Sequence, residues 1–200
     1  DIGAIVAPIQ LKKINSLVIG PGLKLEDYDS SELWSLILNC PGNAVLDAGI
    51  FDLIKEDPER LKSGKGNYIL TPHSGELLRL TEKLDQNQHE IDLAIKLSKK
   101  SGAIIVLKGK PSLTISGDEI YWNRTGNNAL AVAGSGDSLS GIIAALSTHS
   151  EKEDLVKRVA TAVFIHGRLG AIGKEKVGER SLKPSIFSYF MPEIWKEIQA

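Results

Sequence analysis

The stretch "AGSGDSLSGIIAAL" (residues 133–146) places a glycine–serine–glycine loop and a carboxylate directly before an apolar segment. Apolar side chains recur in that segment at the spacing i, i+3, i+4 and i+7: Leu139, Ile142, Ile143 and Leu146. This spacing predicts an amphipathic helix over 137–147 whose buried face would fix its N-terminus. The first turn of a helix exposes unpaired N–H groups at the positive end of its dipole. The main chain of Gly134, Ser135 and Gly136 is therefore a candidate anion hole.

Asp137 follows this loop at once, and its position allows two interpretations. As a structural residue it would be the helix N-cap, although Ser135 or Ser138 could cap the helix as well. As a functional residue it would be a general base. A carboxylate beside an anion site repels the anion, so its presence there suggests a second function, such as taking a proton from an attacking hydroxyl. We favour the second interpretation and predict that Asp137 is catalytic.

The composition excludes several classes of protein. The 200 residues are 42% hydrophobic and 24% charged with a net charge of −1, so neither a nucleic-acid surface nor a polybasic membrane surface is expected. Cys40 is the single cysteine, which rules out an intrachain disulfide and favours a reducing, cytoplasmic setting. No apolar run is long enough to span a membrane. The chain begins Asp-Ile-Gly and its only methionine is Met191, so we expect an N-terminal segment to be missing.

Short apolar runs alternate with helix-like segments along the chain. The predicted strands are 16–20, 43–48, 67–71 and 103–109, and the predicted helices besides 137–147 are 30–38, 74–80, 88–102, 152–170 and 186–198. Strands this apolar are typical of a parallel sheet that is buried on both faces. Residues 112–123 differ, because two short strands flank the turn Gly117-Asp118 and predict a β-hairpin. The sequence therefore predicts one α/β domain over 1–200.

Four predicted strands end in glycine-rich or reactive sequence: Gly20-Pro21-Gly22, Asp47, Thr71-Pro72-His73 and Lys108-Gly109. Ligands bind at the carboxyl ends of parallel strands, so we expect these groups to meet Asp137 in one crevice. Lys108 is predicted to contact phosphate, helped by Gly109 and Ser112. Structural alternatives stay open: a surface lysine for Lys108, a turn histidine for His73 and a helix cap for Asp47.

Other motifs indicate no chemistry. Glu76 is most simply a first-turn helix acid. His89, His149 and His166 lack metal-ligand spacing and are expected to be structural, so no protein-held metal site is predicted. The loop "GSGDSLSG" (134–141) matches neither the dinucleotide fingerprint nor a P-loop.

Several stretches together resemble one family: "VIGPGL" (18–23), "VLDA" (45–48), "LTPHSGELLRL" (70–80), "VLKGKPS" (106–112) and "AGSGDSLSGIIAAL" (133–146). They are similar to the ADP/ATP-dependent NAD(P)H-hydrate dehydratases of the ribokinase-like superfamily. The resemblance implies a mostly parallel central sheet flanked by helices, with the β-hairpin before the catalytic loop. It also implies a repair reaction, in which the hydroxyl of hydrated NADH or NADPH is phosphorylated by ADP or ATP with Mg²⁺, and phosphate then leaves.

The same resemblance implies roles for individual residues. The substrate-binding residues would be Gly22, Asp47, His73, Asn127 and Asp137. The nucleotide-binding residues would be Lys108, Gly109, Lys110, Pro111, Ser112 and Gly136. A homo-oligomer and a fused or separate NAD(P)HX epimerase are expected partners.

The chain also departs from the family pattern. Lys24 and Gly49 stand where the family usually has a glycine and an acid, and residues 127–132 lack a usual threonine. Two alternatives therefore stay open. One is a ribokinase-like kinase of a small vitamin precursor, and the other is a catalytically degenerate relative that binds nucleotide.

Overall fold

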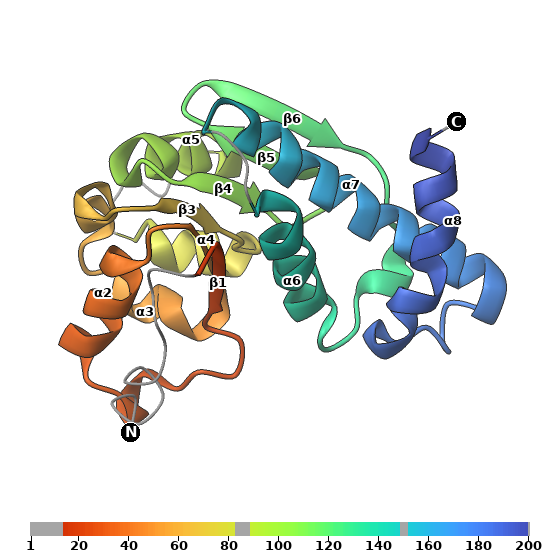
Figure 1. Ribbon diagram of the computed structural model, residues 1–200, viewed down its shortest axis with the longest axis horizontal. Coiled ribbons are helices and arrows are strands. Elements are labelled where there is room, and N and C mark those ends of the chain that lie inside the picture. Colours follow the sequence, from red (N-terminus) through yellow and green to blue (C-terminus); the bar gives the residue numbers. More distant parts are fainter. Residues whose placement is uncertain (1–13, 83–88, 149–151, 200) are drawn as a thin grey trace.

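A six-stranded sheet forms the centre of the protein in the computed structural model, which describes residues 14–82, 89–148 and 152–199 (Figure 1). The strands lie in chain order: β1 (Ser16–Ile19), β2 (Asn43–Leu46), β3 (Asn67–Leu70), β4 (Ile104–Leu107), β5 (Ser112–Ser116) and β6 (Glu119–Asn123). Strands β1 to β4 are parallel, whereas β5 and β6 are antiparallel. The mostly parallel sheet and the hairpin at Gly117-Asp118 are thus confirmed.

All the predicted helices occur, the one at 74–80 with the predicted ends and the others with shifted ends, whereas the short helix at 51–54 was not predicted. The helices are α2 (Ser30–Asn39), α3 (Phe51–Ile54), α4 (Ser74–Leu80), α5 (Glu90–Ser101), α6 (Ser135–Ser147), α7 (Lys152–Val177) and α8 (Phe187–Gln199). Five short 3₁₀ segments join them in the described ranges: η2 (Leu25–Asp27), η3 (Ala48–Ile50), η4 (Pro58–Ser63), η5 (Asn128–Leu130) and η6 (Pro184–Ile186). The predicted helix at 152–170 is too short, because α7 continues to Val177.

Side chains of the parallel strands alternate between two cores, because successive residues of a strand point to opposite faces. Leu46, Leu70 and Ile105 pack against α2 to α5, whereas their neighbours Val45, Ile69 and Val106 pack against α6 and α7. A third core joins α7 to α8, which lies beside it in Figure 1.

This alternation decides where the residues after the strands point. Asp47 follows Leu46, and Lys108 follows Leu107, so both side chains fall on the face that carries α6. The strand ends thereby bring polar groups under the N-terminus of α6. In the described part of the chain no helix combines the length and apolar character that a membrane span needs. The expectation of one domain over 1–200 stays a prediction.

Candidate active site

Helix α6 begins two residues earlier than predicted, at Ser135, and its N-cap is Gly134. Gly134 has φ +82°, a left-handed conformation that glycine adopts without steric cost. No side chain caps this end, and Ser138 Oγ donates to the Gly134 carbonyl at 3.0 Å. Asp137 is therefore not the N-cap, which removes the structural interpretation of this residue.

The N–H groups at this end of α6 are only partly engaged. The Ser135 N–H donates to the Val132 carbonyl at 3.2 Å, so this member of the predicted anion hole is already occupied. Within the described residues, the N–H groups of Gly134, Gly136 and Asp137 have no main-chain acceptor. Because the N–H groups at the start of a helix need partners from elsewhere, these three are donors available to an anion.

Four side chains, the partly buried Lys108 and the buried Asp47, Glu76 and Ser140, form a polar cluster beside this helix end. Lys108 Nζ lies 2.9 Å from Asp47 Oδ1 and 3.5 Å from Glu76 Oε2. Asp47 Oδ2 accepts a hydrogen bond from Ser140 Oγ at 2.9 Å, and the Ala48 N–H donates to Oδ1 at 2.9 Å. Asp47 is 1% exposed, so its pairing is needed to offset the cost of burying a charge.

This cluster changes the interpretation of two acids. Asp47 does cap the short η3 segment, as its structural alternative supposed, but it also holds Lys108. Glu76 lies in the first turn of α4 as expected, yet it is buried and reaches both Lys108 and the His73 N–H. Lys108 is therefore not a free surface lysine.

His73 has both a structural and a site position. Its Nδ1 accepts hydrogen bonds from the N–H groups of Gly75 and Glu76, and the Glu76 carboxylate accepts from the His73 N–H, which makes a capping box for α4. The side chain is nevertheless 57% exposed and lines a pocket beside the N-terminus of α6. The turn-histidine alternative is thus confirmed without excluding a ligand contact.

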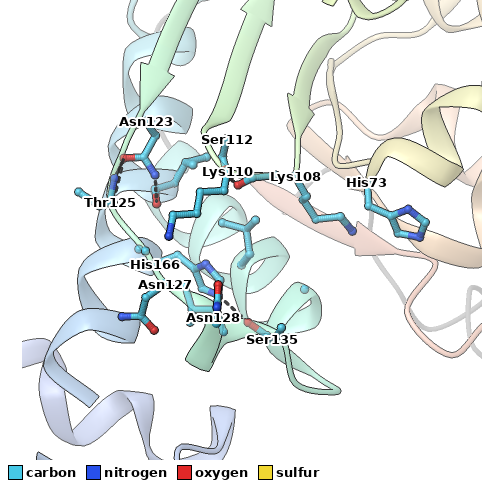
Figure 2. Close-up of a pocket in the computed structure, with 18 residues that line it drawn as sticks. His73, Lys108, Lys110, Ser112, Asn123, Thr125, Asn127, Asn128, Ser135 and His166 are labelled. Atoms are coloured by element: carbon cyan, nitrogen blue, oxygen red, sulfur yellow. Dashed lines mark hydrogen bonds between the residues drawn. The ribbon is translucent and has the colours of Figure 1, made fainter. Parts of the chain in front are cut away.

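A pocket of about 590 Å³ opens beside the N-terminus of α6 (Figure 2). It collects these predicted residues: His73, Lys108, Gly109, Lys110, Ser112, Asn127, Ser135 and Gly136. A Cβ atom on Gly136 would lie 3.6 Å from Lys108 Nζ and 3.8 Å from Asp47 Oδ2. The glycine loop, the lysine and its acid are therefore neighbours.

Other predicted residues lie outside this pocket. Asp137 is exposed in the first turn of α6, one residue beyond Gly136, and Pro111 lines a smaller adjoining pocket. Gly22 has φ +70°, and the space where its side chain would lie is open. Asp47 is too buried to line any of these pockets. The predicted site residues therefore form two sets: those that line this pocket, and those, such as Asp137 and Gly22, that lie outside it.

His166 is a site residue that the sequence reasoning missed. It is 9% exposed, lines the pocket, and places Nε2 at 3.2 Å from Ser135 Oγ, while its ring meets Phe187 edge-on at 5.8 Å. Burial lowers its pKa from 6.5 to about 4; a hydrogen bond with the Ser135 main chain opposes this shift and the charge of Lys108 adds to it. Helical spacing could have pointed to His166 from the sequence, because Val163, His166 and Gly167 lie on the same face of α7 and line the pocket.

The departures from the expected family pattern fit the fold locally. A Cβ on Gly49 would lie 2.0 Å from the Leu23 carbonyl oxygen, so the backbone would have to move before an acid could stand there. Asn127 caps η5 by accepting from the Ala129 N–H at 2.9 Å. The divergent 127–132 stretch thus still forms an ordered wall of the pocket. Among the residues that the structure describes, no group of three or more His, Cys, Asp and Glu side chains could hold a metal ion.

Comparisons with known proteins agree with this geometry. The family described as NAD(P)H-hydrate dehydratase matches residues 4–192. The ADP-dependent (S)-NAD(P)H-hydrate dehydratase of Bacillus subtilis is 33% identical over 92% of this chain and 65% of its own length. The bifunctional NAD(P)H-hydrate repair enzyme Nnr of Moorella thermoacetica is 30% identical over 95% of this chain. The chain covers 36% of that relative, so it spans about a third of the bifunctional enzyme's length.

Solved structures give the same result. The Bacillus subtilis ADP/ATP-dependent NAD(P)H-hydrate dehydratase, co-crystallised with ATP/Mg²⁺, superposes with a TM-score of 0.76 at 27% identity, covering 96% of this chain and 68% of that one. A ribokinase-like superfamily protein of Enterococcus faecalis, 24% identical, has a TM-score of 0.74 over 94% of this chain and 64% of its own, which confirms the expected fold class. By sequence and by structure, this chain belongs to the NAD(P)H-hydrate dehydratase family.

Proposed function

We propose that the protein returns hydrated NADH or NADPH to the normal cofactor at the expense of ADP or ATP. The substrate hydroxyl attacks the terminal phosphorus of the nucleotide, and the phosphorus–oxygen bond to the leaving AMP or ADP breaks. Inorganic phosphate then leaves, the neighbouring ring carbon loses a proton to solvent, and the ring double bond returns. The observation that carries this proposal is the meeting of Lys108, Gly136 and the free first-turn N–H groups of α6 at one pocket. Phosphoryl transfer needs such positioned positive charge.

The residues divide between two roles in this scheme. Lys110 and Ser112, with Gly109 and Pro111, line the pockets after β4 and would hold the nucleotide. The N–H groups of Gly134, Gly136 and Asp137 would hold the phosphoryl group in transit. Ser135, whose N–H is already bonded to the Val132 carbonyl, would shape this turn.

The hydrated cofactor would lie on the open side of α6. Asp137 would take the proton of the attacking hydroxyl, and its exposed place beside Gly136 suits that task. His73, Gly22 and Asn127 would contact the substrate, and Asp47 would act on it indirectly because the protein already engages both of its oxygens.

Mg²⁺ fits this site as a companion of the nucleotide. Asp47 and Glu76 supply two carboxylates for the single ammonium of Lys108, so the cluster retains negative charge beside the helix end. Magnesium prefers oxygen ligands and is commonly held by one or two carboxylates together with substrate phosphates. The nucleotide phosphates would be its main ligands, and it would neutralise their charge.

An assay on hydrated NADH and hydrated NADPH, each with Mg²⁺ and either ADP or ATP, tests the proposal. Recovery of reduced-nicotinamide absorbance together with free phosphate is the expected result. Accumulation of a stable phosphorylated compound would instead indicate a kinase. Tight nucleotide binding without turnover would indicate a degenerate relative.

We also propose that a companion epimerase, fused or separate, works with this protein in the cytoplasm, and that the protein self-associates. The bifunctional repair enzymes among its relatives support a second activity acting alongside the first. Light scattering of the purified protein tests self-association, with a molar mass above that of one chain expected.

A further inference from the structure

Two lysines lie two residues apart after β4, and their surroundings differ. Lys110 is exposed and extends into the pocket toward Asn127 and His166, while Lys108 extends the other way toward His73 (Figure 2). In the described ranges no carboxylate pairs with Lys110, whereas Lys108 lies between two. The two side chains are therefore not equivalent phosphate contacts.

Lys108 is held by a chain of contacts that starts on the catalytic helix itself. Ser140 Oγ donates to Asp47 Oδ2 at 2.9 Å, and Asp47 Oδ1 accepts from Lys108 Nζ at 2.9 Å. Ser140 is fully buried, and it lies one turn beyond Gly136 on α6. The helix that presents the N–H groups thus also fixes the carboxylate that fixes the lysine.

This series of contacts ends at Lys108, beside the place where negative charge would develop on the phosphoryl group. Lys108 Nζ would lie 3.6 Å from a Cβ on Gly136, next to the free N–H groups. We infer that Lys108 is a catalytic residue that contacts the phosphoryl group in transit, and that Asp47 and Ser140 are positioning residues that hold its ammonium there. This inference rests on the proposed function and assigns separate roles to Lys108 and Lys110.

The chemistry of the step supports this division. As the substrate oxygen bonds to phosphorus and the bond to the leaving nucleotide breaks, negative charge spreads over the three other phosphoryl oxygens. The proton of the substrate hydroxyl goes to Asp137, and Lys108 keeps all of its protons. An ammonium already fixed by Asp47 needs no reorganisation when that charge develops, which is the condition for strong transition-state stabilisation.

Matched substitutions of the two lysines test the inference kinetically. Lys108→Met should lower kcat roughly 10²- to 10³-fold and leave the KM for nucleotide nearly unchanged, because the lost contact is made in the transition state. Lys110→Met should raise the KM for nucleotide with little change in kcat. Identical behaviour of the two variants, with the loss only in KM, would overturn the inference while leaving the proposed function intact.

The positioning residues need a milder change and a control. Ser140→Ala should lower kcat about tenfold without changing the KM for nucleotide, and Ser140→Thr, which keeps the hydroxyl, should recover most of it. Ser98→Ala is the matched control, because Ser98 is also a buried helical serine whose hydroxyl donates to a protein oxygen, the Ala103 carbonyl at 2.7 Å. In a Lys108→Met background, Ser140→Ala should have no further effect on kcat. A full additional loss there would overturn the positioning role.

A second measurement does not depend on turnover. Acylation of lysines by an amine-reactive ester, read by peptide mass spectrometry, should modify Lys108 more slowly than Lys110, since a paired ammonium is a poor nucleophile. Asp47→Asn and Ser140→Ala should each speed modification of Lys108 by about threefold or more and leave Lys110 unchanged. Equal rates in all variants would overturn the inference. The expected pattern in a protein that fails to dehydrate hydrated cofactor would uphold the positioning and refute the proposed function.

Discussion

The two sides of the N-terminus of α6 differ in how completely the fold encloses them. On the pocket side, Ser135 and His166 are almost fully buried and bonded to each other, and loops after β4 and β6 close around them. On the other side, Asp137 is exposed, and His73, which also lines the pocket, is more than half exposed. Most residues proposed for the nucleotide therefore line one pocket, whereas Asp137 and Gly22, proposed for the hydrated cofactor, lie outside it, and His73 and Asn127 line the pocket between the two.

The difference follows from how the chain builds each side. The pocket is made largely by one continuous stretch, 108–139, backed by α7 at 163–167, so local turns and one helix suffice to shape it. The open side depends on the ends of separate strands, where Gly22, His73 and Asp137 come from distant parts of the sequence. The ion pair between the buried Asp47 and the partly exposed Lys108 lies between the two sides, next to Gly136. We infer that chemistry takes place at this shared boundary.

The largest expected effect concerns Asp137 on the open side. Asp137→Asn should lower turnover by about 10³-fold or more, because the amide cannot accept the hydroxyl proton. Its exposure predicts a change of less than about 0.5 kcal/mol in the free energy of unfolding. Recovery of reduced cofactor and urea denaturation measure the two quantities. Asp118→Asn, at the exposed hairpin turn, is the control, and near-normal turnover in Asp137→Asn would remove this residue from the mechanism.

The next effect concerns His166 on the enclosed side. Its pKa is about 4 in the folded protein and near 6.5 when unfolded, so the unfolded state binds the proton more readily between these values. The resulting stability is fully present above pH 6.5 and is lost as the pH falls toward 4, by on the order of 3 kcal/mol. Urea denaturation from pH 4 to 7 should therefore show a shallower pH dependence in His166→Leu than in the wild type. Equal slopes would show that His166 is not held neutral by burial.

His73 separates a structural effect from a binding effect. His73→Ala should cost about 1 kcal/mol of stability through loss of the α4 cap, and should raise the KM for hydrated cofactor about tenfold. His73→Asn can still cap the helix, so it should recover the stability and not the KM. If nucleotide affinity falls instead, His73 belongs to the enclosed side.

The smallest effect is expected at Gly22. Gly22→Ala places a methyl group in open space but at φ +70°, which should cost about 1 kcal/mol of stability. The KM for hydrated cofactor should rise no more than about threefold, and ADP affinity from calorimetry should not change. A loss of ADP affinity would contradict the division between the two sides.

Much of the fold was predictable because its signals are local. The apolar runs of β1 to β4, the Gly117-Asp118 turn and the α6 periodicity each depend on a few neighbouring residues. The early start of α6 was missed because Gly134, and not an acid or serine, caps the helix. The extension of α7 to Val177 was missed because only Ile172 of this segment packs into the core shared with α8, which leaves the local apolar pattern weak.

For the site, the sequence alone determined that glycine, lysine and carboxylate residues stand at the strand ends and before α6. This was possible because local signals locate the ends of the strands and the start of the helix. Only the tertiary structure decided which of them touch. In the folded protein Glu76 pairs with Lys108, and Ser140 donates a hydrogen bond to Asp47. His166 of α7 lies within hydrogen-bond distance of Ser135. The physical reason is that the face on which a side chain emerges, and the strand it crosses, depend on register and sheet order, which local sequence does not specify.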